Sequence, residues 1–526
     1  MATSPEFLPT RPEGDGAVDS VPRHRSKRPV ASIFVHAGAG YHSVTNERVH
    51  LKACTDAARI GMSFLKAGAT AAEAVEAAIR CLEDKEITNA GFGSNLNIDG
   101  VVECDATIVD HLGRSGACGA VPGVKNPISL AKKVLDTSTQ PLSLGRVPPN
   151  LLVGQGAKEF ADEHGIKTTR NESLVSKNAM GRYLRWSEEL RKAEAKMNAR
   201  TSFFGNYSSG QRTPKRGDYE KVASPAGIGA LRDHTSAILM GTWNEGQPDS
   251  PDSGGPPLGE HGSPAVATAS ASSRPSTPRQ SVECTALRSE SSHLMAPPPL
   301  SASGHDGPGI SDNAEVDMVD DFCHHGTEPD EAKAQHPDVD IVTDTVGAIA
   351  IDLQGNIAAG SSSGGIGMKH RGRMGPAALV GVGTAVVPED PDDDLATSVA
   401  AVTSGTGEHI ATCCASGKCA ERLFQGTRRG PGGRDIPEED EHAILESFIV
   451  DDFLGHPGVR NQSTAGAIGV MAVKKDRTGA YFYFAHNTDS FALASMSSTE
   501  REPLCVMSRL GKTRQVAQGG RKVRLQ

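Results

Sequence analysis

The chain has 526 residues, which at about 150 residues per domain suggests roughly three domains. Its formal charge of −10 argues against a nucleic-acid-binding protein, because phosphate contacts require a basic surface. No apolar run approaches the roughly 18 residues of a membrane span, and no apolar signal-peptide core is found, so neither a membrane nor a secretory route is expected.

The N-terminal part begins with a segment that lacks a structural pattern. Residues 1–29 are rich in Pro, Arg and Ser and show no periodicity, which predicts a disordered tail. A short strand is predicted at 33–36, followed by the glycine loop 37–40. Two helices come next, and Thr70 and Glu73 have the spacing of a capping box at the start of the second one.

Alternating elements continue to about residue 200. A glycine-rich loop at 89–95 precedes a predicted strand at 101–109, and helices are predicted at 127–135 and 183–198. This succession of strands and helices is typical of an α/β domain.

A change in composition marks the middle of the chain. Residues 248–308 hold 11 of the 32 prolines, and such a segment cannot bury enough apolar surface to offset its chain entropy. We therefore predict a disordered insertion over 203–338. The apolar run 235–240 inside it fits either a docking segment or an isolated apolar patch.

Ordered structure is predicted to resume close to residue 345. The predicted elements are strands at 345–351, 357–360 and 397–402, a loop at 404–407, a helix from about residue 408, and a hairpin of 465–473 with 480–486. The first two strands are apolar at consecutive positions, which is typical of strands covered on both faces. The simplest architecture is one α/β body interrupted by the insertion.

Common catalytic and metal-binding motifs are missing from the sequence. We find no G-x-S-x-G elbow, no H-E-x-x-H helix and no P-loop. Ten cysteines lie at irregular positions, which favours reduced thiols over a disulfide framework. Cys413, Cys414 and Cys419 fit an apolar role on a helix better than a metal site. The run Cys323-His324-His325 is interpreted as a chance cluster, so no metal site is expected.

Thr345 is the strongest catalytic candidate. It follows Asp344 at the boundary between the predicted insertion and a buried strand, so a break in the preceding bond would make it a new N-terminus. A free N-terminal threonine carries a nucleophilic hydroxyl and, in its own α-amino group, a base with a pKa of ~7.7–8.0. Because an Asp-Thr pair also arises by chance, the neighbouring motifs have to show whether Thr345 is catalytic.

Three features support Thr345. Ser363 ends the second strand of the same hairpin and can return beside it. The basic segment 369–373 follows and supplies cations for a carboxylate. Ser404 and Gly405 lie at a predicted strand-to-helix turn, where free backbone N–H groups can stabilise an oxyanion. Taken singly, each feature also fits an ordinary glycine turn.

Together these motifs resemble a known family. Over roughly residues 30–200 and 340–510 the chain is similar to the N-terminal-nucleophile hydrolases of the plant-type asparaginase group (asparaginase type 2). Within that group the likeness is greater to the threonine aspartases (taspases), which are endopeptidases. The motifs that carry the resemblance are His36 to Ser43, Asn89 to Asn97, Glu103 to Ala106, Asp344 to Ala348, Ser363 to Gly365, Gly372-Arg373 and Gly405 to Glu408.

The resemblance implies how the chain activates itself. Thr345 is the implied nucleophile, exposed when the precursor cuts itself between Asp344 and Thr345. Ser363 matches the supporting hydroxyl of the family. Asn89 matches an asparagine in the loop that faces the nucleophile.

The resemblance also implies how a substrate is bound. Arg373 matches the arginine that grips a substrate carboxylate, and Ser404 with Gly405 matches the oxyanion-stabilising pair. Neither a metal nor an organic cofactor takes part in the chemistry of the family. Some asparaginases bind a structural alkali ion, and the sequence leaves open whether 83–88 does so here.

The fold implied by the resemblance is a four-layer αββα sandwich, interrupted here by a long disordered insertion. The chain then divides into a tail (1–29), an N-terminal or α part of the hydrolase domain (30–202), the insertion (203–338) and a C-terminal or β part (339–526). The implied assembly is an αβ heterodimer that can pair to (αβ)2. Short basic runs in the tail and the insertion, together with the resemblance, favour an intracellular location in the nucleus, the cytoplasm or both.

Three functions compete. The leading one is a self-activating threonine endopeptidase that cleaves protein substrates after aspartate, and the runner-up is an L-asparaginase or isoaspartyl peptidase acting on small molecules. Pro376 separates the two, because asparaginases keep an aspartate at this position. The third is a non-catalytic scaffold, and the complete set of matching motifs argues against it.

The first prediction concerns the insertion. Deleting 248–308 should leave catalysis intact, because this segment has no periodic apolar pattern and the cost of loop closure changes slowly with length. The measurements are intact-mass analysis for self-cleavage and an assay of peptide hydrolysis. Loss of both in a folded deletion variant would show that the segment is needed for activity.

Overall fold

The computed structural model describes residues 29–205, 345–462, 466–511 and 513–525, with side chains described to residue 196 in the first range. Most of the predicted tail and insertion therefore lies outside the described residues. The same is true of the apolar run 235–240, of Cys323-His324-His325 and of Asp344.

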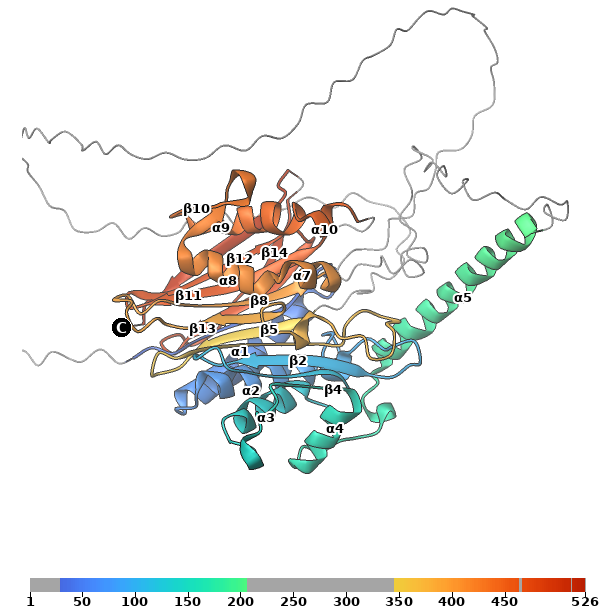
Figure 1. Cartoon of the computed structure of the whole chain (residues 1–526), viewed down its shortest axis with the longest axis horizontal. Helices are drawn as coiled ribbons and strands as arrows, with labels where there is room; N and C mark the ends of the chain where they lie inside the picture. Colours follow the sequence, from blue (N-terminus) through green and yellow to red (C-terminus); the bar gives the residue numbers. More distant parts are fainter. Residues whose placement is uncertain (1–28, 206–344, 463–465, 512, 526) are drawn as a thin grey trace, which may run out of the picture. The chain divides into compact units, whose positions relative to one another are not determined.

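Two sheets dominate the described part of the chain (Figure 1). The larger has eight strands in the order β14-β13-β1-β5-β6-β2-β3-β4, and its β3–β4 pair is parallel while the other pairs are antiparallel. The smaller has five antiparallel strands in the order β15-β12-β11-β8-β7. A separate two-stranded ribbon joins β9 and β10.

The strands of the larger sheet are β1 (Ser32–Gly40), β2 (Glu103–Val109), β3 (Ser115–Pro122), β4 (Leu151–Val153), β5 (Val346–Ile351), β6 (Ile357–Ser363), β13 (Ser490–Ser497) and β14 (Leu504–Arg509). Those of the smaller sheet and the ribbon are β7 (Thr384–Val387), β8 (Ser398–Gly405), β9 (Thr427–Arg429), β10 (Asp435–Pro437), β11 (Ile468–Asp476), β12 (Gly479–His486) and β15 (Ala517–Val523).

Helices cover the outer faces of both sheets (Figure 1). Helices α1, α2 and α3 pack on the larger sheet, and α8 packs on β7 and β8 of the smaller one. The result is the four-layer αββα sandwich expected from the sequence. The helices are α1 (Glu47–Lys66), α2 (Ala71–Glu83), α3 (Pro127–Ser138), α4 (Gly154–Glu163), α5 (Lys177–Gly205), α7 (Gly407–Cys413), α8 (Ala415–Gln425), α9 (Glu441–Ser447) and α10 (Pro457–Arg460), with a π-helical segment at Phe448–Leu454.

Strand β5 shows why the inner strands are apolar at every position. Its Ile349 and Ile351 face the core between the two sheets, where Phe34 of β1 stacks on Phe482 of β12 with ring centroids 5.1 Å apart. Its Ala350 faces the opposite core, under the helices of the outer layer. Because successive side chains point to opposite faces, a strand covered on both sides needs apolar residues throughout. The sequence-based expectation of doubly covered strands is confirmed.

The corner between α1 and α2 follows the predicted local signals. Thr70 Oγ1 accepts a hydrogen bond from the Glu73 backbone N–H, and Glu73 Oε2 accepts one from the Thr70 N–H at 2.8 Å. Gly68 has a φ of +89°, which glycine adopts readily just after a helix. The capping box predicted from the sequence is confirmed.

Other boundaries differ from the prediction. Ser404 and Gly405 were predicted in a loop, but they are the last two residues of β8 and pair with β11. The hairpin predicted as the final one is β11–β12, and three further strands, β13 to β15, follow it. These strands contain many small or polar residues, so their pairing partners decide their structure more than their own propensity does.

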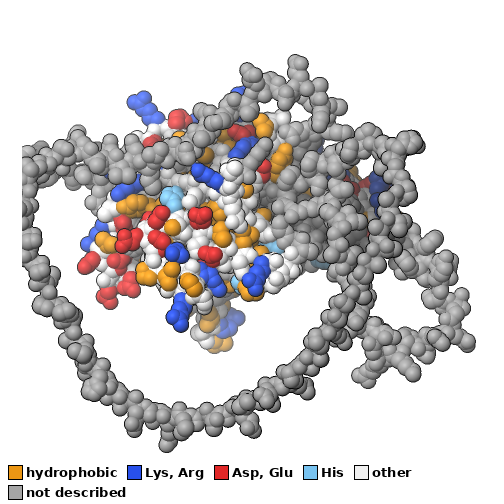
Figure 2. All heavy atoms as spheres, turned by 90° about the horizontal axis from the view of Figure 1, so that it is seen from above, with side chains coloured by type: hydrophobic (Ala, Val, Ile, Leu, Met, Phe, Trp, Pro, Cys, Tyr) orange, Lys and Arg blue, Asp and Glu red, His pale blue; other side chains and the backbone are white. Residues whose placement is uncertain are grey.

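The surface shows the acidic balance of the chain. Figure 2 shows a face on which acidic side chains gather toward one edge, with basic side chains scattered around them. In the part of the chain that the structure describes, no helix combines the length and apolar character needed to cross a bilayer.

Candidate active site

The β5–β6 hairpin brings the predicted nucleophile next to its predicted supporting residue. Val346 pairs with Ser362 in an antiparallel ladder, and continuing this register by one residue sets Thr345 opposite Ser363. Both residues are buried, with 4% and 3% of their surface exposed. On its other side Ser363 pairs with Asp105 of β2. Thr345 and Ser363 therefore lie at the same end of adjacent strands.

Asn89 lies against the turn that follows Ser363. Its backbone carbonyl accepts a 2.7 Å hydrogen bond from Gly364 N–H, and its Nδ2 donates to the Gly365 carbonyl at 2.9 Å. Its Oδ1 accepts from the Asn95 N–H at 2.9 Å. The side chain is fully buried. Asn89 thus joins its glycine-rich loop to the end of β6, and its catalytic role stays a prediction.

Helix α5 braces the same loop from outside. Arg182 is buried, and it donates to Asn95 Oδ1 at 3.1 Å and to the Gly93 carbonyl at 2.9 Å. Burial lowers the pKa of Arg182 to about 10. One turn further on, the Trp186 ring lies so close to Gly367 that a Cβ at that position would come within 2.0 Å of it. Sequence reasoning predicted this helix but not its contact with the site.

Ser404 links the two sheets. Its Oγ accepts a 3.1 Å hydrogen bond from the backbone N–H of Ala39. Ala39 lies in β1, because the strand continues through the glycine segment 37–40 that was predicted as a loop. Strand β1 pairs His36 with Gly347 of β5, so the residues after His36 run toward Thr345. This contact occupies the Ser404 hydroxyl, and the oxyanion role of Ser404 stays a prediction.

Gly405 has a conformation that only glycine takes easily. Its φ is +137°, and a Cβ would lie 2.3 Å from the Ala467 carbonyl oxygen. The strand therefore comes as close to β11 as its backbone allows. The predicted participation of Gly405 in oxyanion stabilisation is not settled by this packing and stays a prediction.

Arg373 lies among glycines and a proline. Its Nε and Nη2 donate to Glu408 Oε1 at 3.0 and 2.8 Å. A Cβ at Gly407 would lie 2.6 Å from Arg373 Nη2 and 3.0 Å from Pro376 Cδ, so the proline ring borders the guanidinium. The Arg373 side chain is 14% exposed and that of Glu408 is 61% exposed. Of the predicted basic segment, Arg373 is the residue that faces this glycine-lined space.

The other cations of that segment have different partners. Lys369 is buried and donates to the carbonyls of Glu103 and Gly364 at 2.6 and 2.9 Å. Arg371 is bound to the carboxylate of Asp99 at the surface. Lys369 thus holds the turn after Ser363 in place through the Gly364 carbonyl. The sequence did not indicate this contact.

Asp105 is a site residue that sequence reasoning missed. It is fully buried next to Ser363, and its two carboxylate oxygens accept hydrogen bonds from Ala120 N–H and Gly375 N–H, both at 2.8 Å. Burial raises the pKa of Asp105, while the charges of Lys369 and Arg373 oppose that rise. The residue lies within the matching motif Glu103 to Ala106, which was the available signal.

Glu83 supports the β5–β6 hairpin from the helix side. Its Oε1 lies 2.7 Å from Ser362 Oγ and accepts the Ile128 N–H at 3.0 Å, and its Oε2 accepts Asn126 Nδ2 at 3.1 Å. Burial raises the pKa of Glu83 to about 8. Because the carboxyl group is then largely protonated at neutral pH, it bridges β6 and α3 without a buried charge.

His36 packs directly on β5. A Cβ at Gly347 would lie 2.3 Å from His36 Nε2, so only glycine fits at this position of β5. Among the described residues neither ring nitrogen of His36 has a hydrogen-bond partner, and burial lowers the pKa of the ring to about 3. The imidazole is therefore neutral across the physiological range.

The loop before Asn89 contains a group of backbone oxygens. The carbonyls of Lys85, Glu86 and Thr88 all lie within 2.9 Å of the place that a Cβ of Gly93 would take. These three carbonyls leave no room for a side chain at position 93, so only glycine fits in this loop.

Side-chain metal sites are a separate matter. In the described ranges, no group of three His, Cys, Asp or Glu side chains is arranged to hold a metal ion. The eight cysteines described are free thiols, of which Cys419 is buried in the core beneath α8 and Cys414 is exposed between α7 and α8.

Comparison with known proteins identifies the family. The family model described as asparaginase (Asparaginase_2) matches residues 29–246 and 311–431, which is more than half of the chain. The chain belongs to this family. Its members are N-terminal-nucleophile hydrolases with the αββα fold, in agreement with the two sheets and outer helices seen here.

Relatives within the asparaginase family match about a third of the chain. A rat isoaspartyl peptidase/L-asparaginase is 38% identical over 170 residues, which cover 32% of this chain and 48% of the rat protein. The human protein of the same name is 40% identical over 147 residues, or 27% and 44%. A plant-type L-asparaginase of Pyrococcus horikoshii is 36% identical over 170 residues, or 32% and 51%. The chain spans about half the length of the curated relatives it matches.

The second prediction tests the packing around Asn89. A Cβ at Gly364 would lie 2.5 Å from Ser94 Cβ and 2.6 Å from Asn89 Oδ1, so Gly364→Ala should displace the end of β6. We expect hydrolase activity to fall about 100-fold, the usual cost of moving a catalytic group by about 1 Å.

The matched control is Gly156→Ala in α4, where no atom lies within 4 Å of the added methyl group. It should retain full activity. Circular dichroism and peptide hydrolysis are measured on both variants. A folded Gly364→Ala protein with normal turnover would contradict the assigned position of the site.

Proposed function

We propose that the chain is a self-activating threonine endopeptidase that cuts itself between Asp344 and Thr345 and then cleaves proteins after aspartate. The observation that carries the proposal is Pro376 beside Arg373, at the position where the family resemblance implies an aspartate in asparaginases. The family assignment supports the hydrolytic chemistry. The proposed specificity for aspartate rests on Arg373 and Pro376.

Self-cleavage follows from the position of Thr345. Its hydroxyl oxygen attacks the Asp344 carbonyl carbon, the C–N bond breaks, and the hydroxyl proton passes to the leaving α-nitrogen. The product is an ester between the Asp344 carbonyl and Thr345 Oγ1. Water then hydrolyses the ester and leaves an Asp344 carboxylate and a free N-terminal threonine.

The mature threonine repeats the chemistry on other chains. Its α-amino group has an ordinary pKa of ~7.7–8.0, so near neutral pH it can take the hydroxyl proton and return it to the leaving amine. The buried position of Thr345 beside Ser363 supports this assignment, because Ser363 can hold the nucleophile through its hydroxyl. Asn89 and Lys369 hold the turn after Ser363 in place.

Specificity for aspartate is argued from charge. In a peptide, the aspartate side chain offers a carboxylate to Arg373, while its α-nitrogen is a neutral amide. A second carboxylate facing that amide would be an uncompensated charge in a closed site. Pro376 avoids this cost, and the arginine fork can hold the carboxylate with two parallel hydrogen bonds.

Two observations favour the alternative, an L-asparaginase or isoaspartyl peptidase. The relatives described above carry that name. Glu408 also places a carboxylate on Arg373, and it could hold the α-ammonium group that free asparagine presents. The two functions therefore differ in what Glu408 does, and this difference can be measured.

The protein partners follow from the endopeptidase proposal. Substrates would be proteins with an accessible aspartate at the cleavage site. The two products would stay together as an αβ heterodimer, with pairing to (αβ)2 as the larger assembly. The nuclear and cytoplasmic location expected from the sequence belongs to the same proposal.

The third prediction concerns self-cleavage. The purified protein should yield fragments of 344 and 182 residues, and Thr345→Ala should remain one chain of 526 residues without activity. Intact-mass analysis reads both results. Thr345→Ser, which keeps a hydroxyl nucleophile, is the matched control and should still cleave. A fully active preparation that stays at 526 residues would rule out this activation.

The fourth prediction compares substrates on the matured enzyme. A peptide containing Asp should be cleaved after that residue, its Asn counterpart should react slowly, and free asparagine should react least. Arg373→Ala should reduce turnover of the Asp peptide about 100-fold, because the substrate carboxylate would lose its buried cation.

Glu408→Gln provides the discriminating control. It should retain most activity on the Asp peptide if Glu408 only orients Arg373. Faster turnover of free asparagine than of the Asp peptide, abolished by Glu408→Gln, would falsify the endopeptidase assignment and establish the alternative.

A further inference from the structure

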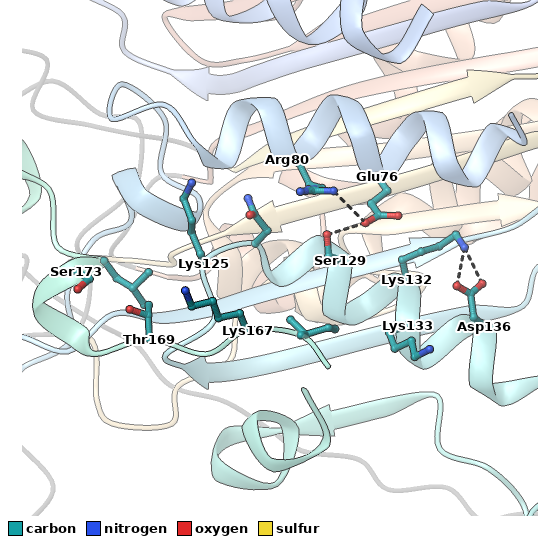
Figure 3. Close-up of a pocket in the computed structure, with 13 residues that line it drawn as sticks. Glu76, Arg80, Lys125, Ser129, Lys132, Lys133, Asp136, Lys167, Thr169 and Ser173 are labelled. Carbon is teal, nitrogen blue, oxygen red and sulfur yellow. Dashed lines mark hydrogen bonds and ion pairs between the residues drawn. The ribbon is translucent and has the colours of Figure 1, made fainter. Parts of the chain in front are cut away.

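A pocket lies in the outer helical layer, between α2, α3 and the segment 166–174 (Figure 3). Its volume is about 640 Å3, within the roughly 300–1,000 Å3 of small-molecule sites. None of the predicted site residues lines it. Whatever it binds is therefore separate from the substrate carboxylate held by Arg373, and the inference does not depend on the proposed function.

The lining of this pocket is basic. It contains five cationic side chains against two acidic ones, a formal balance of +3 in a protein of net charge −10. The cations come from two helices and two connecting segments, so the charge is not the face of one helix. They are Arg80 of α2, Lys125 before α3, Lys132 and Lys133 of α3, and Lys167 of the segment 166–174.

The acidic groups nearby are already engaged. Glu76 accepts the Ser129 hydroxyl at 2.7 Å and lies 4.0 Å from Arg80. Asp136 holds Lys132 at 2.6 and 2.8 Å, as the dashed lines in Figure 3 show. Lys125 is paired outside the pocket with Asp84 at 2.8 Å. These carboxylates offset part of the positive charge.

Two cations are left over. Within the described ranges, neither Lys133 nor Lys167 has an acidic group within 4.0 Å. They come from opposite sides of the pocket, one from α3 and one from the segment 166–174 (Figure 3). Their positive charges add to the lining of the pocket, and a bound anion would compensate them.

Neutral donors complete the lining. Thr169 and Ser173 contribute hydroxyl groups, whereas Ser129 already donates to Glu76, and Asn126 to Glu83 and Asp84. Lysine ammonium groups together with hydroxyls suit the tetrahedral oxygens of phosphate. We propose that this basic pocket binds a small anion that carries two or more phosphate groups.

The fifth prediction is tested by titrating pyrophosphate into the full chain at low ionic strength, where screening is weak. Isothermal titration calorimetry should show one site with a dissociation constant below about 1 mM. Lys133→Gln with Lys167→Gln should weaken binding about tenfold, because each removes a charge-assisted contact and keeps most of the side-chain length.

Two further variants protect the test against misfolding. Lys66→Gln with Lys196→Gln removes two exposed lysines that do not line the pocket and should leave the affinity unchanged. Asp136→Asn releases Lys132 from its ion pair and should tighten binding severalfold. A gain in affinity cannot come from an unfolded protein.

The ligand class is tested in the same titration. Orthophosphate should bind more weakly than pyrophosphate, since it carries fewer charges. A synthetic peptide of residues 312–340, which is rich in Asp and Glu, should not compete at equal concentration. No heat with pyrophosphate, equal affinity in the Lys133 and Lys167 double variant, or displacement by the peptide would overturn the proposal.

Discussion

The candidate active site depends on one register, that of β5 against β6. The hairpin is held between β1 and β2, so a slip of one residue would break two further ladders and turn every side chain of the strand to the opposite core. Because Val346 must face Ser362, the residue before it must face Ser363. The position of the proposed nucleophile is thus set by the packing of apolar strands and requires no contact of its own.

Around that fixed point the chain places ionisable groups that water cannot solvate. Hydrogen bonds to backbone groups hold the side chains of Asp105 and Lys369 in place, and the two do not form a direct ion pair in the described structure. Glycines at 364, 365, 375 and 407 let the backbone come close enough to make this possible. Removing one member of such a buried network leaves the others uncompensated. Small residues dominate here because a larger side chain would separate the backbone groups from the charged groups that they bind.

Local signals in the sequence predicted much of the fold. The capping box at Thr70, the doubly apolar strand at 346–351 and the motifs around Ser363 follow from short-range chemistry, and the structure contains all three. What could not be predicted depends on long-range contacts. Arg182 meets Asn95 across 87 positions of sequence, and nothing in its own helix distinguishes it from other surface arginines. The end of β8 was misjudged for the same reason, since its partner β11 lies more than 60 residues away.

The order of strands in the larger sheet makes refolding of the cut chain different from refolding of the uncut chain. Strand β1, from the part before the predicted cut, lies between β13 and β5, both from the part after it. An uncut chain that unfolds can refold alone, because all its strands are tethered. A cut chain that unfolds must find its other half again, at a rate that depends on concentration. The unfolding curve on heating and the refolding curve on cooling would therefore coincide for the uncut chain and differ for the cut chain.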